Sequence, residues 1–267
     1  MALTKFSVLN LSFTASVAAV VVALTGCQTV DPVPGDHIGT DLMHGRGGTT
    51  RHVFPLGSAL KSAGILVEMP LMPWSKGRIY DKRYEASMVE IDTYVAHLRS
   101  AGAKRIVVAG FSIGANAALG YAARREDLSG VILLAHGHVP GIPGFSRKLS
   151  DSVEKARSMI DVGEGDQTAV FTDFGGGNDT ATSTANDLLS WFDPSGPATI
   201  AKNAPKVKPN TPVLCIDGSS DRWKRCGQIM WQVPRDPMNR QISVSADHMS
   251  TPSVAIQPIV DWLRELK

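Results

Sequence analysis

Short apolar runs alternate with helix-like stretches along most of the chain. Continuous apolar runs of this length are typical of strands buried on both faces of a parallel sheet. We predict six strands, at residues 37–43, 65–71, 105–111, 130–136, 212–218 and 241–247. Helical patterns occur between most of them and at the C-terminus, at residues 54–64, 84–102, 114–125, 221–233 and 252–267. This alternation predicts an α/β fold, a mostly parallel sheet flanked by helices.

The alternation is interrupted between residues 139 and 210, an interval too long for an ordinary crossover. It contains two helical patterns, at residues 146–160 and 184–192, and a glycine-rich polar stretch at residues 173–184 that we interpret as a loop. We predict that residues 139–210 form a helical lid inserted into one domain that spans residues 37–267. Its aromatic residues either line a pocket or form a small core of the lid: Phe171, Phe174, Trp191 and Phe192.

Composition narrows the class of protein. The chain has 267 residues, of which 43% are hydrophobic and 19% charged, and this balance is ordinary for a globular domain. The net charge is +2 and no basic stripe is present, so long-range electrostatics give no support to a nucleic-acid partner.

The first 26 residues have the layout of an export signal: one early lysine, a long uncharged apolar stretch, and small residues before Cys27. The segment Leu24–Cys27 resembles a bacterial lipobox. That resemblance implies cleavage before Cys27 and acylation of its sulfur and amino group, and several acyl chains hold a protein stably on a membrane. The alternatives are a plain secretory signal or a single membrane anchor.

Residues 28–36 contain two prolines and no periodicity, and we predict that they form a tether between the membrane and the domain. Residue 28 is glutamine rather than the aspartate that often retains lipoproteins in the inner membrane, which favours the outer membrane of a bacterial envelope.

Two further cysteines, Cys215 and Cys226, fall in a predicted strand and in the helix after it. Disulfides persist in exported proteins, but the spacing does not say whether the two side chains face each other. We expect two small buried hydrophobic side chains rather than a bond.

One serine stands between two glycines in the segment Gly110-Phe111-Ser112-Ile113-Gly114. It follows a predicted strand directly and precedes an alanine-rich helix. A sharp strand–turn–helix requires small residues on both sides of its central residue, lifts that side chain above the sheet and leaves the next amide free. We therefore expect Ser112 to be a catalytic nucleophile, whereas the pentapeptide alone is equally compatible with a simple turn.

A nucleophilic serine needs a base and a group that orients the base. His248 follows the last predicted strand and Asp221 follows the preceding one. Because loops at the carboxyl ends of parallel strands gather at one edge, we expect Ser112, Asp221 and His248 to meet there. Asp217 and Asp247 are competing candidates for the acid.

Glycines after the first predicted strand let backbone amides approach a bound oxygen closely. We expect the amides of Arg46 and Ile113 to form an oxyanion hole, with His44, Gly45 and His136 at the pocket rim. A dinucleotide site is the competing interpretation: Gly45 and Gly47 match its glycine pattern and Glu68 stands where a ribose ligand is expected, but Thr50 occupies the third glycine position.

His136 and His138 have a spacing that zinc tolerates, but no cysteine or carboxylate cluster accompanies them, so we expect no metal. We expect no cofactor either.

Together the segments LMHGRGG (residues 42–48), GFSIGA (110–115), GSSD (218–221) and ADH (246–248) resemble the α/β-hydrolase family of serine hydrolases, over about residues 37–267. The resemblance implies a Ser–Asp–His triad that forms an acyl-enzyme, which water then releases. The chain departs from the family in starting at the third of its usual eight strands, and the lid matches no particular subfamily.

The sequence thus predicts a membrane-tethered serine hydrolase that acts on a small-molecule ester, thioester or amide. Acyl transfer to an acceptor other than water stays open. The alternative from another class is a non-catalytic envelope lipoprotein that uses the same fold to bind a partner.

Overall fold

The computed structural model describes residues 37–174 and 179–266. Its centre is a six-stranded, wholly parallel sheet with the strand order β2-β1-β3-β4-β7-β8. Its strands are β1 (Ile38–Met43), β2 (Leu66–Glu68), β3 (Arg105–Phe111), β4 (Gly130–Leu134), β7 (Val213–Gly218) and β8 (Arg240–Val244). The predicted α/β architecture, a mostly parallel sheet of about six strands flanked by helices, is therefore confirmed.

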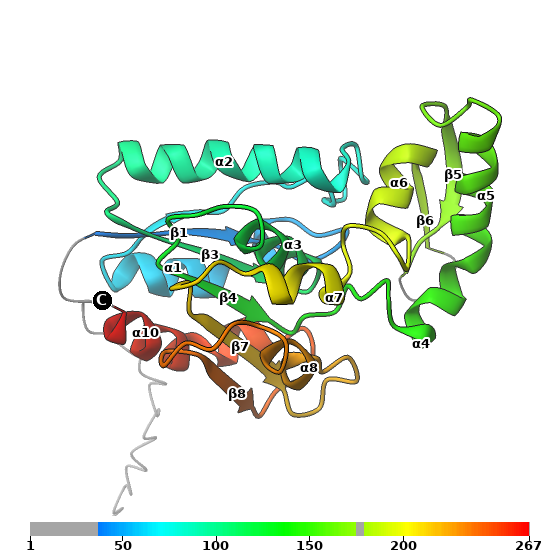
Figure 1. Ribbon diagram of the computed structural model, residues 1–267. Helices are drawn as coiled ribbons and strands as arrows, with labels where there is room; N and C mark the ends of the chain where they lie inside the picture. Colours follow the sequence, from blue (N-terminus) through cyan, green and yellow to red (C-terminus); the bar gives the residue numbers. More distant parts are fainter. Residues whose placement is uncertain (1–36, 175–178, 267) are drawn as a thin grey trace, which may run out of the picture.

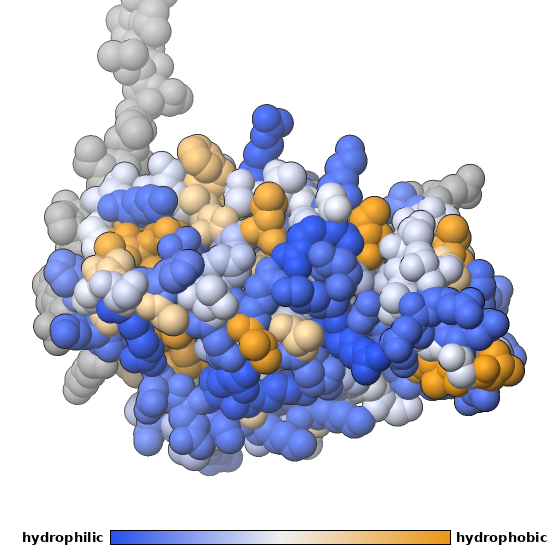
Figure 2. Space-filling model, turned by 90° about the horizontal axis from the view of Figure 1, so that it is seen from above, coloured by the Kyte–Doolittle hydropathy of each residue, from blue (hydrophilic) through white to orange (hydrophobic). Residues whose placement is uncertain are grey.

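Helices cover both faces of the sheet (Figure 1). The helices that pack on it are α1 (Phe54–Ser62), α2 (Tyr84–Ser100), α3 (Ile113–Ala122), α8 (Cys226–Met230), α9 (Thr251–Val254) and α10 (Ile256–Glu265). Alternate residues of β3 serve two separate cores: Ile106 and Val108 pack towards the α2 and α3 side, and Val107 and Ala109 pack towards α1 and α10. This two-sided burial explains why β3 is a nearly continuous apolar run. Seen over α2, the surface is mostly hydrophilic with small scattered apolar groups (Figure 2).

The segment predicted as a lid contains a β-hairpin as well as helices. Its elements are α4 (Pro143–Ser146), α5 (Ser150–Asp161), β5 (Thr168–Thr172), β6 (Thr180–Thr184), α6 (Ala185–Phe192) and α7 (Ile200–Asn203). The antiparallel strands β5 and β6 stand with α5 and α6 beyond the carboxyl ends of the main strands (Figure 1). The expectation of a loop throughout residues 173–184 is wrong, because β6 lies there. Its strand signal is an alternation of exposed threonines with buried Ala181 and Ser183, and no large apolar residue takes part.

Two predicted helices are shorter than their patterns suggest. Helix α8 begins only at Cys226, because the Asp221 carboxylate accepts the amide of Trp223 at 2.8 Å and holds the preceding residues in a turn. The C-terminal pattern is divided at Ala255 into α9 and α10. Pro258 has no amide hydrogen to donate to Val254, so one helix cannot continue through this point.

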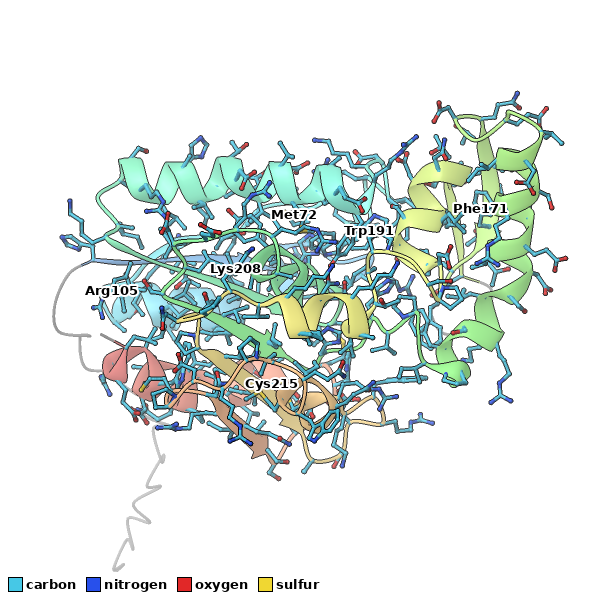
Figure 3. The ribbon with its side chains drawn as sticks, viewed as in Figure 1. Met72, Arg105, Phe171, Trp191, Lys208 and Cys215 are labelled. Atoms are coloured by element: carbon cyan, nitrogen blue, oxygen red, sulfur yellow. A yellow bond between two sulfur atoms is a disulfide. The ribbon has the colours of Figure 1, made fainter. Side chains whose placement is uncertain are left out.

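Cys215 and Cys226 form a disulfide, with 5.4 Å between their Cα atoms. The expectation of two unbonded hydrophobic side chains is wrong. The Asp217 carboxylate accepts the amide of Cys226 at 2.9 Å, which brings the start of α8 back against β7. The bond closes a loop of 11 residues' separation that contains Asp221, and therefore restricts the segment that carries this acid. Figure 3 marks Cys215 in the lower half of the sheet.

Trp191 lies where the lid meets the main domain (Figure 3). Its ring contacts Trp74 and Tyr84 edge to face, with centroids 5.3 and 4.8 Å apart, and its Nε1–H donates to the Lys82 carbonyl at 2.9 Å. Phe171, Trp191 and Phe192 are buried. Figure 3 places Phe171 within the lid, away from Trp191. Phe174 differs from these three because it lines a pocket.

The predicted signal peptide (1–26), the lipidation site Cys27 and the tether (27–36) lie outside the described residues. Among the helices that the structure describes, none combines the length and apolarity that a bilayer crossing requires.

Candidate active site

Ser112 occupies a strained turn between β3 and α3. Its φ and ψ angles are 58° and −113°, a conformation that residues other than glycine rarely adopt. A Cβ atom on Gly110 would lie 2.1 Å from the backbone of Gly114, and one on Gly114 would lie 2.7 Å from the carbonyl oxygen of His44. Gly110 and Gly114 must therefore both be glycine for the turn to close, and this steric requirement explains the two glycines of the pentapeptide.

The three side chains expected to act together form one hydrogen-bonded chain. His248 Nε2 lies 3.1 Å from Ser112 Oγ, and His248 Nδ1 lies 2.7 Å from Asp221 Oδ2. Burial acts to raise the pKa of Asp221, but hydrogen bonds from His248 and the Trp223 amide outweigh it, so that pKa lies below its ordinary value. An ionised Asp221 accepts from Nδ1–H and leaves Nε2 to accept the serine proton.

The two competing acids have other partners. Asp217 is buried and accepts the Cys226 amide, and burial raises its pKa. The exposed Asp247 accepts from the amide of Ser250 at 2.8 Å and from its hydroxyl at 2.6 Å. Of the three acids, Asp221 is the one hydrogen-bonded to His248.

The loop after β1 is fixed from beneath. Trp74 Nε1–H donates to the His44 carbonyl at 2.7 Å, and the Gly47 amide donates to the Trp74 carbonyl at 2.8 Å. The Met72 amide donates to His44 Nε2 at 3.1 Å, which leaves the proton on Nδ1 to bind the Gly45 carbonyl at 2.7 Å. Burial lowers the pKa of His44 to about 4, in keeping with this neutral form.

Arg46 and Ile113 both line the pocket with Ser112. Ile113 is the first residue of α3, where amides have no partner within the helix. None of the described groups accepts the Arg46 amide. Both residues of the predicted oxyanion hole therefore border the pocket that contains Ser112.

Two of the expected rim residues are not at the rim. Gly45 lines the pocket, but His44 and His136 are fully buried and do not. Strand ends locate these residues correctly without giving the direction of their side chains, and both histidines point into the protein. Burial lowers the pKa of His136 to about 3, and neither ring nitrogen has a partner among the described residues.

The pocket has a volume of about 650 Å³, and aromatic side chains form part of a wall that also carries charged residues. Phe145 and Phe174 stack with ring centroids 4.0 Å apart, and Phe174 meets Trp223 edge to face at 5.1 Å. Sequence patterns did not single out Phe145 or Trp223, because a pocket lining has no periodicity.

Gly137 is a second residue that sequence patterns missed. A Cβ at this position would lie 3.0 Å from Ser112 Oγ and 2.9 Å from His248 Cε1. The absent side chain keeps space open directly above the serine, and only the folded geometry reveals this. Within residues 37–174 and 179–266, no group of three or more His, Cys, Asp or Glu side chains is arranged to hold a metal.

No family model and no curated protein matches the sequence. Solved structures that resemble the chain include a monoacylglycerol lipase from Paleococcus ferrophilus, with 20% identity, a TM-score of 0.62, and coverage of 89% of this chain and 96% of that one. A carboxyl esterase from Bacillus coagulans has 15% identity and a TM-score of 0.63 over 88% of this chain and 92% of that one. Est1E from Butyrivibrio proteoclasticus has 16% identity and a TM-score of 0.57 over 87% of each chain. These likenesses show that the chain has the α/β-hydrolase fold.

Proposed function

We propose that this protein is a serine hydrolase that cleaves a carboxylic ester of a small molecule. The observation that carries the proposal is the hydrogen-bonded chain Ser112–His248–Asp221 at a pocket of about 650 Å³. A cavity of this size is typical of small-molecule sites. The esterases and lipases among the structural neighbours support the same reaction class.

The geometry suits a two-step acyl transfer. Ser112 Oγ attacks the ester carbonyl while His248 Nε2 takes its proton, and the negative oxygen accepts from the Ile113 and Arg46 amides. His248 then returns the proton to the leaving alkoxide, so an alcohol departs and an acyl-enzyme remains. Water attacks next, again with His248 as base, and releases the acid. Asp221 orients the imidazole and stabilises its charged form. The same steps serve a thioester or an amide, and the reaction needs no cofactor.

The sharpest test is labelling by a fluorophosphonate, which reacts with activated serines and not with ordinary ones. We expect covalent modification of Ser112, identified by peptide mass spectrometry, together with hydrolysis of p-nitrophenyl esters of graded acyl length. If the folded protein remains unlabelled, the binding-scaffold hypothesis replaces the enzyme.

We also propose that acylated Cys27 anchors the enzyme in a bacterial envelope, on the outer membrane in view of Gln28. We expect labelled palmitate to enter the full-length protein in bacterial cells and to be lost with Cys27→Ala. Equal labelling of both proteins is the contradicting result.

A further inference from the structure

One ion-pair cluster joins the loop after β1 to the lid. The Arg46 guanidinium contacts Asp173 Oδ2 at 2.7 Å and Asp179 Oδ2 at 2.8 Å. Asp173 follows β5 and its side chain is only 5% exposed, whereas that of Asp179 is 41% exposed. A buried, short, charge-assisted contact restricts its partner much more than an exposed one does.

Residue 46 is held from two directions. The peptide that carries its amide is fixed through the Gly45 carbonyl, which accepts from His44 Nδ1 at 2.7 Å and from the Gly48 amide at 3.2 Å, and its side chain is fixed by the lid acids. Within the described part of the chain, every hydrogen bond of Arg46 comes from its guanidinium, while its amide has no acceptor and the residue lines the same pocket as Ser112. On either side of Arg46 the loop is hydrogen-bonded to Trp74, through the His44 carbonyl and the Gly47 amide. The position of the Arg46 amide therefore depends on these loop bonds and, from the lid side, on where Asp173 and Asp179 hold the guanidinium.

Asp173 is itself well fixed. Its Oδ1 accepts the Phe174 amide at 2.6 Å, and its own amide donates to the Asp179 carbonyl at 2.9 Å. The ring of Phe174 contacts Trp223, whose amide binds Asp221. Two adjacent lid residues thus contact both sides of the candidate active site. Asp173 contacts Arg46 in the loop after β1, and Phe174 contacts Trp223 in the segment after β7 that carries Asp221.

We propose that Asp173 is a positioning residue, which acts through Arg46 to hold the Arg46 amide where it binds the oxyanion. This inference rests on the proposed hydrolase function. Asp173 touches no reacting atom, so its removal acts on the transition state and not on ground-state binding. An oxyanion donor must lie within about 2.7–3.1 Å of the oxygen, and a shift of about 1 Å costs up to about 100-fold in rate.

A rival electrostatic role predicts the opposite sign. Asp173 and Asp179 neutralise the guanidinium, so if charge were the controlling quantity, Asp173→Asn would unmask a cation near the oxyanion and raise kcat. Positioning predicts a fall. The direction of the change therefore separates the two roles.

The experiment measures kcat and KM for a p-nitrophenyl ester in Asp173→Asn, Arg46→Met and the double variant. We expect each single variant to lower kcat about tenfold with KM nearly unchanged, since a loosened donor loses part of its contribution. The double variant should be no slower than Arg46→Met, because Asp173 acts through Arg46. The matched control is Asp92→Asn on α2, which removes an equally short 2.7 Å ion pair with Arg125 and should leave kcat unchanged.

Unchanged or raised kcat in Asp173→Asn, or additive losses in the double variant, would overturn the inference. If the Asp173→Asn protein does not fold, Arg46→Met decides alone: unchanged kcat overturns the inference and lowered kcat supports it. Failure of the proposed function looks different, because wild-type protein would then show neither ester hydrolysis nor fluorophosphonate labelling.

Discussion

Replacement of Ser112 by alanine is expected to lower kcat for ester hydrolysis by about 10⁶-fold, while the fold stays intact. The variant removes the one oxygen placed 3.1 Å from His248 Nε2, so no acyl-enzyme can form. Alanine is smaller than serine and introduces no clash into the turn. Steady-state rates with a p-nitrophenyl ester, together with circular dichroism and thermal unfolding, check this result. Activity near that of the wild type would mean that Ser112 is not the nucleophile.

The fall in kcat in Asp221→Asn can be compared with the larger fall expected in Ser112→Ala. Asparagine keeps the shape of the acid but cannot stabilise a charged imidazole and favours the wrong tautomer, so a loss of about 10⁴-fold is expected. The exposed Ser62 on α1 is a suitable control, because Ser62→Ala removes a serine hydroxyl far from the pocket and should leave kcat unchanged.

The sequence predicted the sheet well because burial on both faces leaves little choice of residue. The central strands β3, β4 and β7 are largely apolar and buried, and the chain returns to the same edge of the parallel sheet after each strand. That rule alone places Ser112, Asp221 and His248 at the carboxyl end of the sheet, where the structure brings them within hydrogen-bond distance. Their identification needed no side-chain detail.

Side-chain direction is what the pattern could not give. His44 and His136 follow strands at the expected edge, yet both turn inwards and are completely buried. The Cys215–Cys226 disulfide depends in the same way on the angle at which α8 returns to β7. These outcomes are decided by packing between elements distant in the chain, which no local periodicity records.

The contact between Arg46 and Asp173 shows the limit most clearly. The two residues are 127 positions apart, and Asp173 lies in a stretch that sequence patterns assigned to a loop. Charged residues in loops are normally solvated, so nothing local separates this buried acid from its neighbours. The β-hairpin that presents it is built largely from threonine, serine and alanine, and lacks the apolar signal by which the other strands were found.

Three buried histidines make the fold sensitive to acid. Burial lowers the pKa of His136 to about 3 and those of His44 and His138 to about 4. In the unfolded chain each takes up a proton below about pH 6.5, whereas the folded protein excludes it. The free energy of unfolding is therefore not reduced by these histidines above about pH 6.5, and it falls as the pH decreases from there towards their pKa values in the folded protein.

Two buried acids oppose this effect. Burial raises the pKa of Asp41 and of Asp217, so the folded protein holds protons that the unfolded chain releases above about pH 3.9. Below about pH 6 the unfolded chain has its histidines largely protonated, so the three buried histidines alone give a slope approaching about 4 kcal/mol per pH unit. Asp41 and Asp217 offset at most two of these three protons. Below about pH 6 the net slope therefore keeps the sign set by the histidines.

We therefore expect the free energy of unfolding in urea to fall between pH 6 and pH 5, and His136→Met to flatten this fall. Methionine fills an apolar site without a polar group that lacks a partner, so the variant should be more stable at pH 5 and its slope smaller by about 1.4 kcal/mol per pH unit. Replacement of the exposed His97 on α2 by glutamine is the control and should keep the wild-type slope. Stability that rises on acidification, or an unchanged slope in His136→Met, would contradict the neutral, buried state of His136, because a histidine that takes up its proton equally in both states contributes nothing to the pH dependence.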